Sequence, residues 1–154
     1  MKTLVLGLGN PILSDDSVGI KAAQEIGKRL NNPQITVAET SAAGLSLLDS
    51  IAGYDKAIII DAVQTKNGKA GQIYRMGPED FSYTKRFSSP HQINLITALE
   101  VGKMLGLVMP QKITIFAVEA KNVTNFGEQC TPKVEQAIPK VVEMVLQELN
   151  AENP

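Results

Sequence analysis

Cysteine, histidine and tryptophan are nearly absent from this chain of 154 residues, which has one cysteine, one histidine and no tryptophan. A single cysteine, Cys130, excludes an intrachain disulfide and any metal site built from several thiolates. A chain without disulfides suits a reducing compartment, so we expect a cytoplasmic protein.

The chain also lacks an excess of positive or negative charge. Fifteen Lys and Arg residues stand against sixteen Asp and Glu, which gives a formal net charge of -1 at pH 7. Without a basic excess, the composition predicts no binding to nucleic acid or to acidic lipid. No apolar run approaches the roughly 20 residues that a membrane helix needs, and residues 4–8 do not resemble a signal peptide. We therefore expect neither a nucleic-acid nor a membrane partner.

Short apolar runs alternate with amphipathic helical patterns, and hydrophobic residues make up 44% of the chain. That content is enough for one compact domain over residues 1–154. We expect it to act as a monomer. The patterns predict strands at 3–8, 35–38, 57–60, 71–76 and 112–118, and helices at 17–30, 45–52, 94–105 and 131–149. Residues 78–90 and 119–129 are predicted loops, and Pro139 is predicted to kink the last helix or divide it.

The predicted strand at 57–60 is apolar on both faces, which implies that helices cover both sides of the sheet. Alternation of strands and helices with short links gives parallel pairing through right-handed crossovers. The sequence therefore predicts an α/β fold, a three-layer α/β/α sandwich with a mostly parallel sheet of about five strands.

Three side chains with useful chemistry follow predicted strands. Asp16 lies after the first strand, Asp61 closes the third, and His91 lies at the entry to a later helix. The carboxyl ends of parallel strands form the usual ligand crevice of such sheets, so we expect these residues on one rim. Two carboxylates and an imidazole suit a divalent ion such as nickel, zinc or iron, with positions left open for another ligand.

Each of these side chains also has a purely structural interpretation. An aspartate before a helix most often caps it, and one of Asp15 and Asp16 is expected to cap the first helix. Cys130 has no histidine near it in the sequence, and Ser88 and Ser89 lack a Gly-x-Ser-x-Gly motif. The sequence therefore favours no covalent nucleophile.

The pair Gly7 and Gly9 after the first strand is similar to part of a dinucleotide-binding loop. The third glycine of that motif would fall on Ile12, and Pro11 stiffens the path that should approach a pyrophosphate. The same opening is similar over five residues to peptidyl-tRNA hydrolases. The histidine expected shortly afterwards is absent, and the chain has no basic face for tRNA.

Three segments together resemble the [NiFe]-hydrogenase maturation proteases: Gly7-Leu8-Gly9-Asn10-Pro11-Ile12-Leu13-Ser14-Asp15-Asp16-Ser17-Val18-Gly19, Ile58-Ile59-Ile60-Asp61-Ala62 and Ser89-Pro90-His91-Gln92. The resemblance implies a phosphorylase/hydrolase-like α/β/α fold and an endopeptidase of the aspartic or metal-dependent type. Such an enzyme removes a short C-terminal extension from the precursor of a hydrogenase large subunit once nickel has been inserted. That precursor is the implied partner.

By the same resemblance, the residues that contact nickel and carry the catalysis are Asp16, Asp61 and His91. The nickel is carried by the substrate, and no permanent organic cofactor is implied. Which carboxylate acts as base stays open, with Asp15 as a spare acid and Asn10 as a candidate donor to the scissile carbonyl.

The chain departs from the family pattern at several places. Asp16 stands where many relatives have Glu, Ser17 where they usually have Gly, and Ala120-Lys121 where Pro-Glu is often found. These departures concern which hydrogenase is served more than the metal contacts. Two other functions remain open: an assembly factor that senses or carries nickel without proteolysis, and a nucleotide-binding α/β domain.

Overall fold

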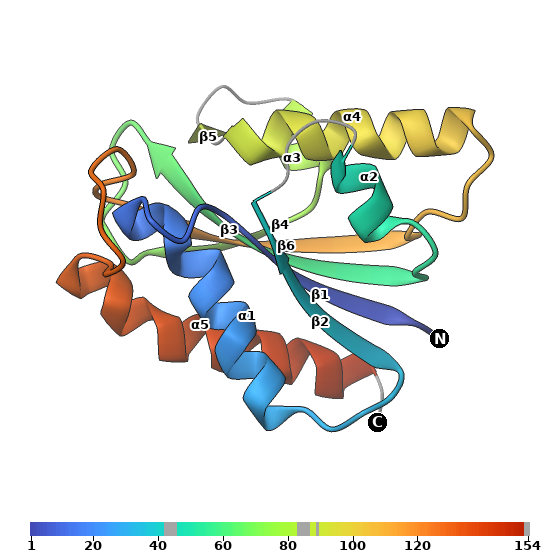
Figure 1. The fold of residues 1–154 in the computed structure, drawn as a ribbon, viewed down its shortest axis with the longest axis horizontal. Helices are drawn as coiled ribbons and strands as arrows, with labels where there is room; N and C mark the ends of the chain where they lie inside the picture. The colour runs from blue at the N-terminus through green and yellow to red at the C-terminus, as the bar shows by residue number, and fades with distance from the viewer. Residues whose placement is uncertain (42–45, 83–86, 89, 153–154) are drawn as a thin grey trace.

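The computed structural model describes residues 1–41, 46–82, 87–88 and 90–152 (Figure 1). For residues 81–82, 87–88, 90–94 and 152 it describes the backbone alone. In chain order the elements are β1 (Thr3–Leu8), the 3₁₀ turn η1 (Ser14–Ser17), α1 (Val18–Arg29), β2 (Ile35–Thr40), α2 (Ser46–Ile51), β3 (Lys56–Thr65), β4 (Ile73–Met76), α3 (Glu79–Ser82), β5 (Phe87–Ser88), α4 (Pro90–Met104), β6 (Lys112–Glu119) and α5 (Pro132–Glu152).

The main sheet has the strand order β2-β1-β3-β6-β4. The first four of these strands are parallel to one another, β4 runs antiparallel to β6, and the short β5 pairs antiparallel with the end of β3. Figure 1 shows α1 and α5 on one face of the sheet and α2 and α4 on the other. The predicted α/β/α sandwich with a mostly parallel sheet is confirmed.

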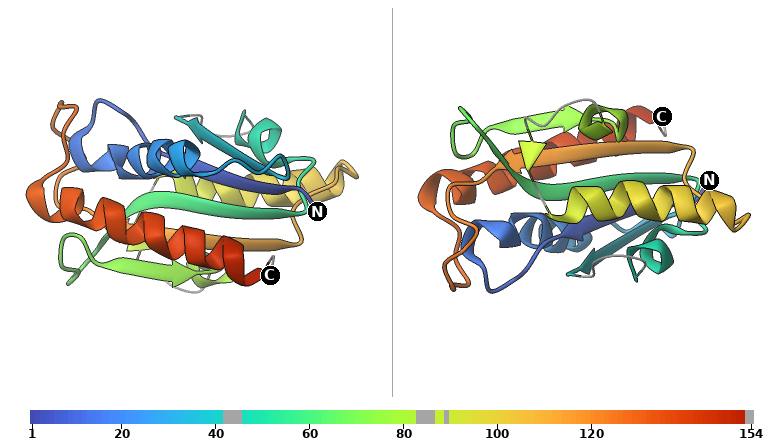
Figure 2. Two further views of the ribbon diagram at one scale, coloured as in Figure 1. Left: turned by 90° about the horizontal axis from the view of Figure 1, so that it is seen from below. Right: turned by 90° about the horizontal axis from the view of Figure 1, so that it is seen from above.

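Figure 2 shows the sheet from its two sides, with α1 and α5 over one face and α4 over the other. The two cores between these layers follow from the alternation of side chains along β3. One core, packed with α1 and α5, takes Ile58, Ile60 and Ala62, and the other, packed with α2 and α4, takes Ala57, Ile59 and Val63. Position 61 belongs to the second set by this alternation, which places Asp61 on the face that α2 and α4 cover.

Several boundaries differ from the sequence-based predictions. β3 continues five residues beyond position 60, because β6 pairs with it as far as Val63 and β5 pairs with its end. The predicted loop at 78–90 contains α3 and β5, and α4 begins at Pro90 rather than at residue 94. α5 runs through Pro139 as one helix, so this proline does not divide it. In the part of the chain described, no helix is both long and apolar enough to span a membrane.

Candidate active site

The candidate site lies where the strand order reverses. From β1 the chain passes through α1 to β2 on one side, and then returns past β1 through α2 to β3 on the other. At such a reversal the two connections leave in opposite directions and a crevice opens beyond the carboxyl ends of the strands. Pairing between β1 and β3 ends at Gly7 and Ile60, so residues of β3 from Asp61 onward extend past β1.

Glycines allow η1 and the start of α1 to lie directly on these strand ends. Gly9 has a φ of +155°, and a Cβ built on it would lie 2.0 Å from the carbonyl oxygen of Asp16. A Cβ on Gly19 would lie 2.3 Å from the carbonyl oxygen of Ile60, and one on Gly7 would lie 2.2 Å from that of Gly19. Backbone packing therefore accounts for the glycine pair, without any bound nucleotide.

The two predicted acids both come to this edge of the sheet. Asp16 lies in η1 and is 8% exposed, and its carbonyl oxygen accepts a hydrogen bond from the Asn10 N–H at 3.3 Å. Asp61 is 2% exposed, and its Oδ1 accepts from the Ala62 N–H at 2.8 Å. Asp61 was predicted at the end of its strand, but it lies within β3, opposite Ala117 of β6. Burying a carboxylate in an otherwise apolar strand costs free energy, which hydrogen bonds to its oxygens offset.

His91 is the second residue of α4, and its side chain lies outside the described residues. Its helix covers the same face of the sheet as Asp61. Leu95, one turn further along α4, is buried in the same core as Ile59 and Val63. Among the side chains that the structure describes, no three His, Cys, Asp or Glu residues gather as a metal site. The three-residue site therefore stays a prediction.

Asp15 has a structural role that the sequence analysis did not assign to it. The residue is fully buried, and its Oδ2 accepts hydrogen bonds from the backbone N–H groups of Lys121 and Asn122, each at 2.9 Å. Its Oδ1 accepts from the Thr131 N–H at 2.6 Å, and the Thr131 hydroxyl lies within 3.1 Å of both oxygens. Asp15 thus fastens the β6–α5 connection to η1.

Neither aspartate caps α1, so that prediction is wrong. The residue that precedes the helix is Ser17, which makes no side-chain capping hydrogen bond. Its hydroxyl donates instead to the Ser14 carbonyl at 2.6 Å. Both acids lie in the 3₁₀ turn that precedes α1, and Asp15 faces the β6–α5 connection from there.

Cys130 is half-buried beside η1, with its Sγ 3.5 Å from the Ser17 hydroxyl oxygen. Burial raises the pKa of the Cys130 thiol, and the hydrogen bond with Ser17 only partly opposes that effect. A protonated thiol is a weak nucleophile at neutral pH, which agrees with the absence of a predicted covalent nucleophile.

Glu119 is a buried acid that the sequence analysis missed. It is 2% exposed and accepts hydrogen bonds from the Thr65 N–H at 2.9 Å, the Thr65 hydroxyl at 2.6 Å and the Tyr74 hydroxyl at 3.0 Å. The sequence could have indicated this buried acid only through its position, because Glu119 is a carboxylate at the end of an apolar strand. Its partners come from β3 and β4, so Glu119 joins three strands at the rim of the sheet.

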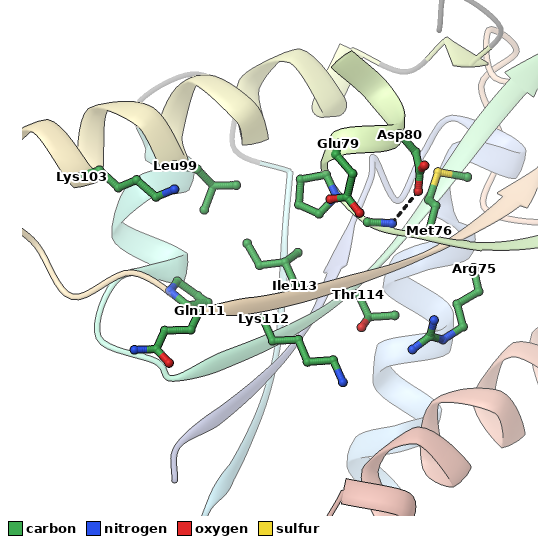
Figure 3. A pocket seen from close by; sticks show the side chains of 13 residues that line it. Arg75, Met76, Glu79, Asp80, Leu99, Lys103, Gln111, Lys112, Ile113 and Thr114 are labelled. Atoms are coloured by element: carbon green, nitrogen blue, oxygen red, sulfur yellow. Dashed lines mark hydrogen bonds between the residues drawn. The ribbon is translucent and has the colours of Figure 1, made fainter. Parts of the chain in front are cut away.

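Two cavities lie at opposite ends of β6. A cavity of about 490 Å³ lies at the carboxyl end of β6, at the segments that Asp15 binds, and is lined by Gln64, Thr131 and residues 121–125. Another of about 700 Å³ lies at the amino end of β6, between α4 and the end of β4, and is lined among others by Arg75, Lys112 and Thr114 (Figure 3). Neither Asp16 nor Asp61 lines either of these two cavities.

The family model described as hydrogenase maturation protease matches residues 20–148 of this chain. The chain belongs to the hydrogenase maturation protease family. It is therefore a peptidase of the α/β class. The matched range includes Asp61 and His91 and begins after Asp16.

Individual relatives agree with this assignment. The hydrogenase 2 maturation protease of Escherichia coli K12 is 31% identical over 150 residues, which are 95% of this chain and 89% of that protein. The solved structure of the hydrogenase maturating endopeptidase HybD from E. coli superposes with a TM-score of 0.85 and 29% identity, covering 99% of this chain and 94% of the other. The fold is also shared with the [NiFe] hydrogenase maturation protease HybD from Thermococcus kodakarensis, at a TM-score of 0.76 and 23% identity, over 96% and 98% of the two chains.

Proposed function

We propose that this peptidase removes the C-terminal extension of a [NiFe]-hydrogenase large-subunit precursor after nickel has been inserted. Membership of the maturation protease family supports the reaction. The observation that carries the site is the buried Asp61, which lies just past the end of β1 on the face of the sheet that α4 covers. The partner is the precursor, and we propose neither a nucleic-acid nor a membrane partner.

In this proposal Asp16, Asp61 and His91 contact nickel that is already bound in the precursor. Carboxylate oxygens and an imidazole nitrogen are ligands that a divalent first-row metal accepts. The metal is part of the substrate, and the enzyme needs no permanent organic cofactor. Recognition of nickel by these side chains would place the scissile segment at the crevice only when the metal is present. We further propose that the enzyme works as a cytoplasmic monomer.

The chemistry proposed is direct attack by water. The water oxygen bonds to the carbonyl carbon, the carbon–nitrogen bond breaks, and the proton released by the water passes to the leaving nitrogen. A carboxylate of the site carries that proton, so we propose an endopeptidase of the aspartic type. It would be of the metal-dependent type if the nickel of the substrate takes part in the reaction. We propose Asp16 and Asp61 as the candidates from the resemblance to the maturation proteases, and we assign Asp15 a structural role, because both of its oxygens accept hydrogen bonds from the backbone of the β6–α5 connection. Asn10 accepts from the Ile12 N–H through its Oδ1, so its amide nitrogen is the part proposed to bind the scissile carbonyl.

The test is to incubate the purified enzyme with the same precursor prepared with and without nickel. Mass spectrometry should show loss of the C-terminal extension from the nickel-loaded precursor and an unchanged mass for the nickel-free one. His91→Ala and Asp61→Asn should abolish the loss of mass. His91→Ala should also leave the melting temperature within a few degrees of the wild type.

Asp49→Asn is the matched control, because Asp49 is an exposed carboxylate on α2. It should process the precursor at the wild-type rate. If nickel-loaded precursor binds the enzyme but stays uncut, the role of a nickel-sensing or nickel-carrying assembly factor replaces proteolysis. If His91→Ala unfolds the protein, His91 has a structural role instead.

A further inference from the structure

Two large apolar side chains are exposed at the edge of the sheet that carries the candidate site. Phe126 is 84% exposed and Ile12 is 49% exposed. Backbone hydrogen bonds join their segments: the Gly127 N–H donates to the Ile12 carbonyl at 2.8 Å, and the Ser14 N–H donates to the Gly127 carbonyl at 2.9 Å. We call Ile12 and Phe126 the apolar lip.

The apolar lip adjoins the turn that carries Asp16. Ile12 precedes Asp16 by four residues, and the turn η1 connects them. Phe126 lies in the β6–α5 connection, and Asp15 binds that connection on both sides of it, at Lys121 and at Thr131. Both lip residues are therefore held against the turn that carries Asp16. A preordered surface of this kind loses little conformational freedom when a partner binds.

The chemistry of the apolar lip suits a protein partner. An exposed phenyl ring and an exposed isoleucine on two hydrogen-bonded segments give an apolar surface that a protein partner can cover. Aromatic and aliphatic side chains at the centre of an interface commonly provide most of its binding energy. The adjoining cavity of about 490 Å³ is lined mainly by polar residues, among them Gln64 and Asn122, which can bind the backbone of an extended segment.

We propose that the apolar lip binds an apolar side chain of the precursor close to the peptide bond that is cut, and so helps to determine which precursor is accepted. This inference rests on the proposed function. The lip acts in binding rather than in the reaction, because neither side chain can transfer a proton or hold a metal. Its loss should therefore raise KM and leave kcat nearly unchanged.

The test compares initial rates of cleavage of nickel-loaded precursor over a range of concentrations. Phe126→Ala should raise KM about tenfold or more, with kcat within about twofold of the wild type. Phe126→Leu, which keeps an apolar group, should recover most of the loss. The melting temperatures should all agree, since the side chain is 84% exposed.

Met104→Ala is the matched control. Met104 is 85% exposed at the end of α4, which leads to the amino end of β6, whereas Phe126 follows its carboxyl end. The eight residues of β6 separate these ends by roughly 25 Å. Met104→Ala should match the wild type in both KM and kcat.

The proposal is overturned if Phe126→Ala keeps the wild-type KM, if it lowers kcat alone, or if Met104→Ala has the same effect. It is also overturned if the wild type sediments as a dimer that Phe126→Ala dissociates without a change in KM, because the lip is then a contact between two copies. If the wild type does not cut the precursor, the proposed proteolysis fails, and binding of the intact precursor decides the role of the lip. Weaker binding by Phe126→Ala then supports the lip, and equal binding or none overturns it.

Discussion

Replacing Asp15 with asparagine tests the claim that this buried carboxylate fastens the β6–α5 connection to η1. The change keeps the size of the side chain and removes its charge. One acceptor oxygen becomes an NH₂ group, which must then face either the Thr131 N–H or the N–H groups of Lys121 and Asn122. Two donors that face each other cannot form a hydrogen bond, and the substituted side chain is fully buried, so water cannot replace the lost bond to it.

The expected loss follows from the bonds that cannot be kept. Hydrogen bonds to a charged group contribute about 1.5–3 kcal/mol each, and a buried donor left without a partner costs about 1–3 kcal/mol. With at least one charged bond lost and one N–H left unpaired, Asp15→Asn should lower the free energy of unfolding by about 3–5 kcal/mol. For a chain of this length, the melting temperature should then fall by roughly 6–20 °C.

Urea unfolding followed by circular dichroism measures this loss, with Asp49→Asn as the exposed control that should change stability by less than about 0.5 kcal/mol. Thr131→Val provides a second check, since it removes the hydroxyl that contacts both oxygens of Asp15. A double-mutant cycle between positions 15 and 131 should show a coupling of about 0.5–3 kcal/mol. A loss below about 1 kcal/mol for Asp15→Asn, or no coupling to Thr131, would refute the assigned role.

Two further predictions concern packing and pH. Gly19→Ala should destabilise the fold by about 3 kcal/mol or more, because its Cβ would lie 2.3 Å from the Ile60 carbonyl oxygen. Gly27→Ala in the same helix should stabilise the fold by about 0.5–1 kcal/mol, because its Cβ would meet only the side chain of Val37, at 3.7 Å. Equal melting temperatures for the two variants would contradict this prediction. The hydrogen bond from Arg75 lowers the pKa of Glu148 below its usual value of 4.5. That contribution is present above about pH 4.5 and is lost as the pH falls through the lowered pKa. Since Arg75 is half exposed, Arg75→Gln should cost at most about 1 kcal/mol in urea unfolding at neutral pH, and the difference from the wild type should disappear in acid. A difference that persists in acid would exclude this ion pair as its cause.

The order and type of the main elements could be predicted because they depend on local patterns. The apolar strand at 57–60 and the apolar stripe of α1 each encode their own burial, and their alternation implies parallel pairing. The end of β3 could not be predicted in this way. Asp61, Gln64 and Thr65 break the apolar pattern, and they stay in a strand because β6 and β5, which come later in the chain, pair with that segment.

The candidate site shows the same division. The sequence indicated that acids after the first and third strands would reach one rim, and Asp16 and Asp61 do lie at that edge of the sheet. It could not distinguish the two neighbouring acids of η1. Asp15 accepts hydrogen bonds from N–H groups more than 100 residues later in the chain, and no sequence pattern near position 15 indicates these bonds.

By itself, the sequence determined the alternation of strands and helices, the α/β class and the segments that resemble the maturation proteases, because periodicity and short motifs are local properties. Tertiary structure alone decided which acid is structural, how far β3 extends past β1, and that Phe126 is exposed beside the turn carrying Asp16. Each of these depends on which distant segments meet, and that is set by the packing of the whole chain.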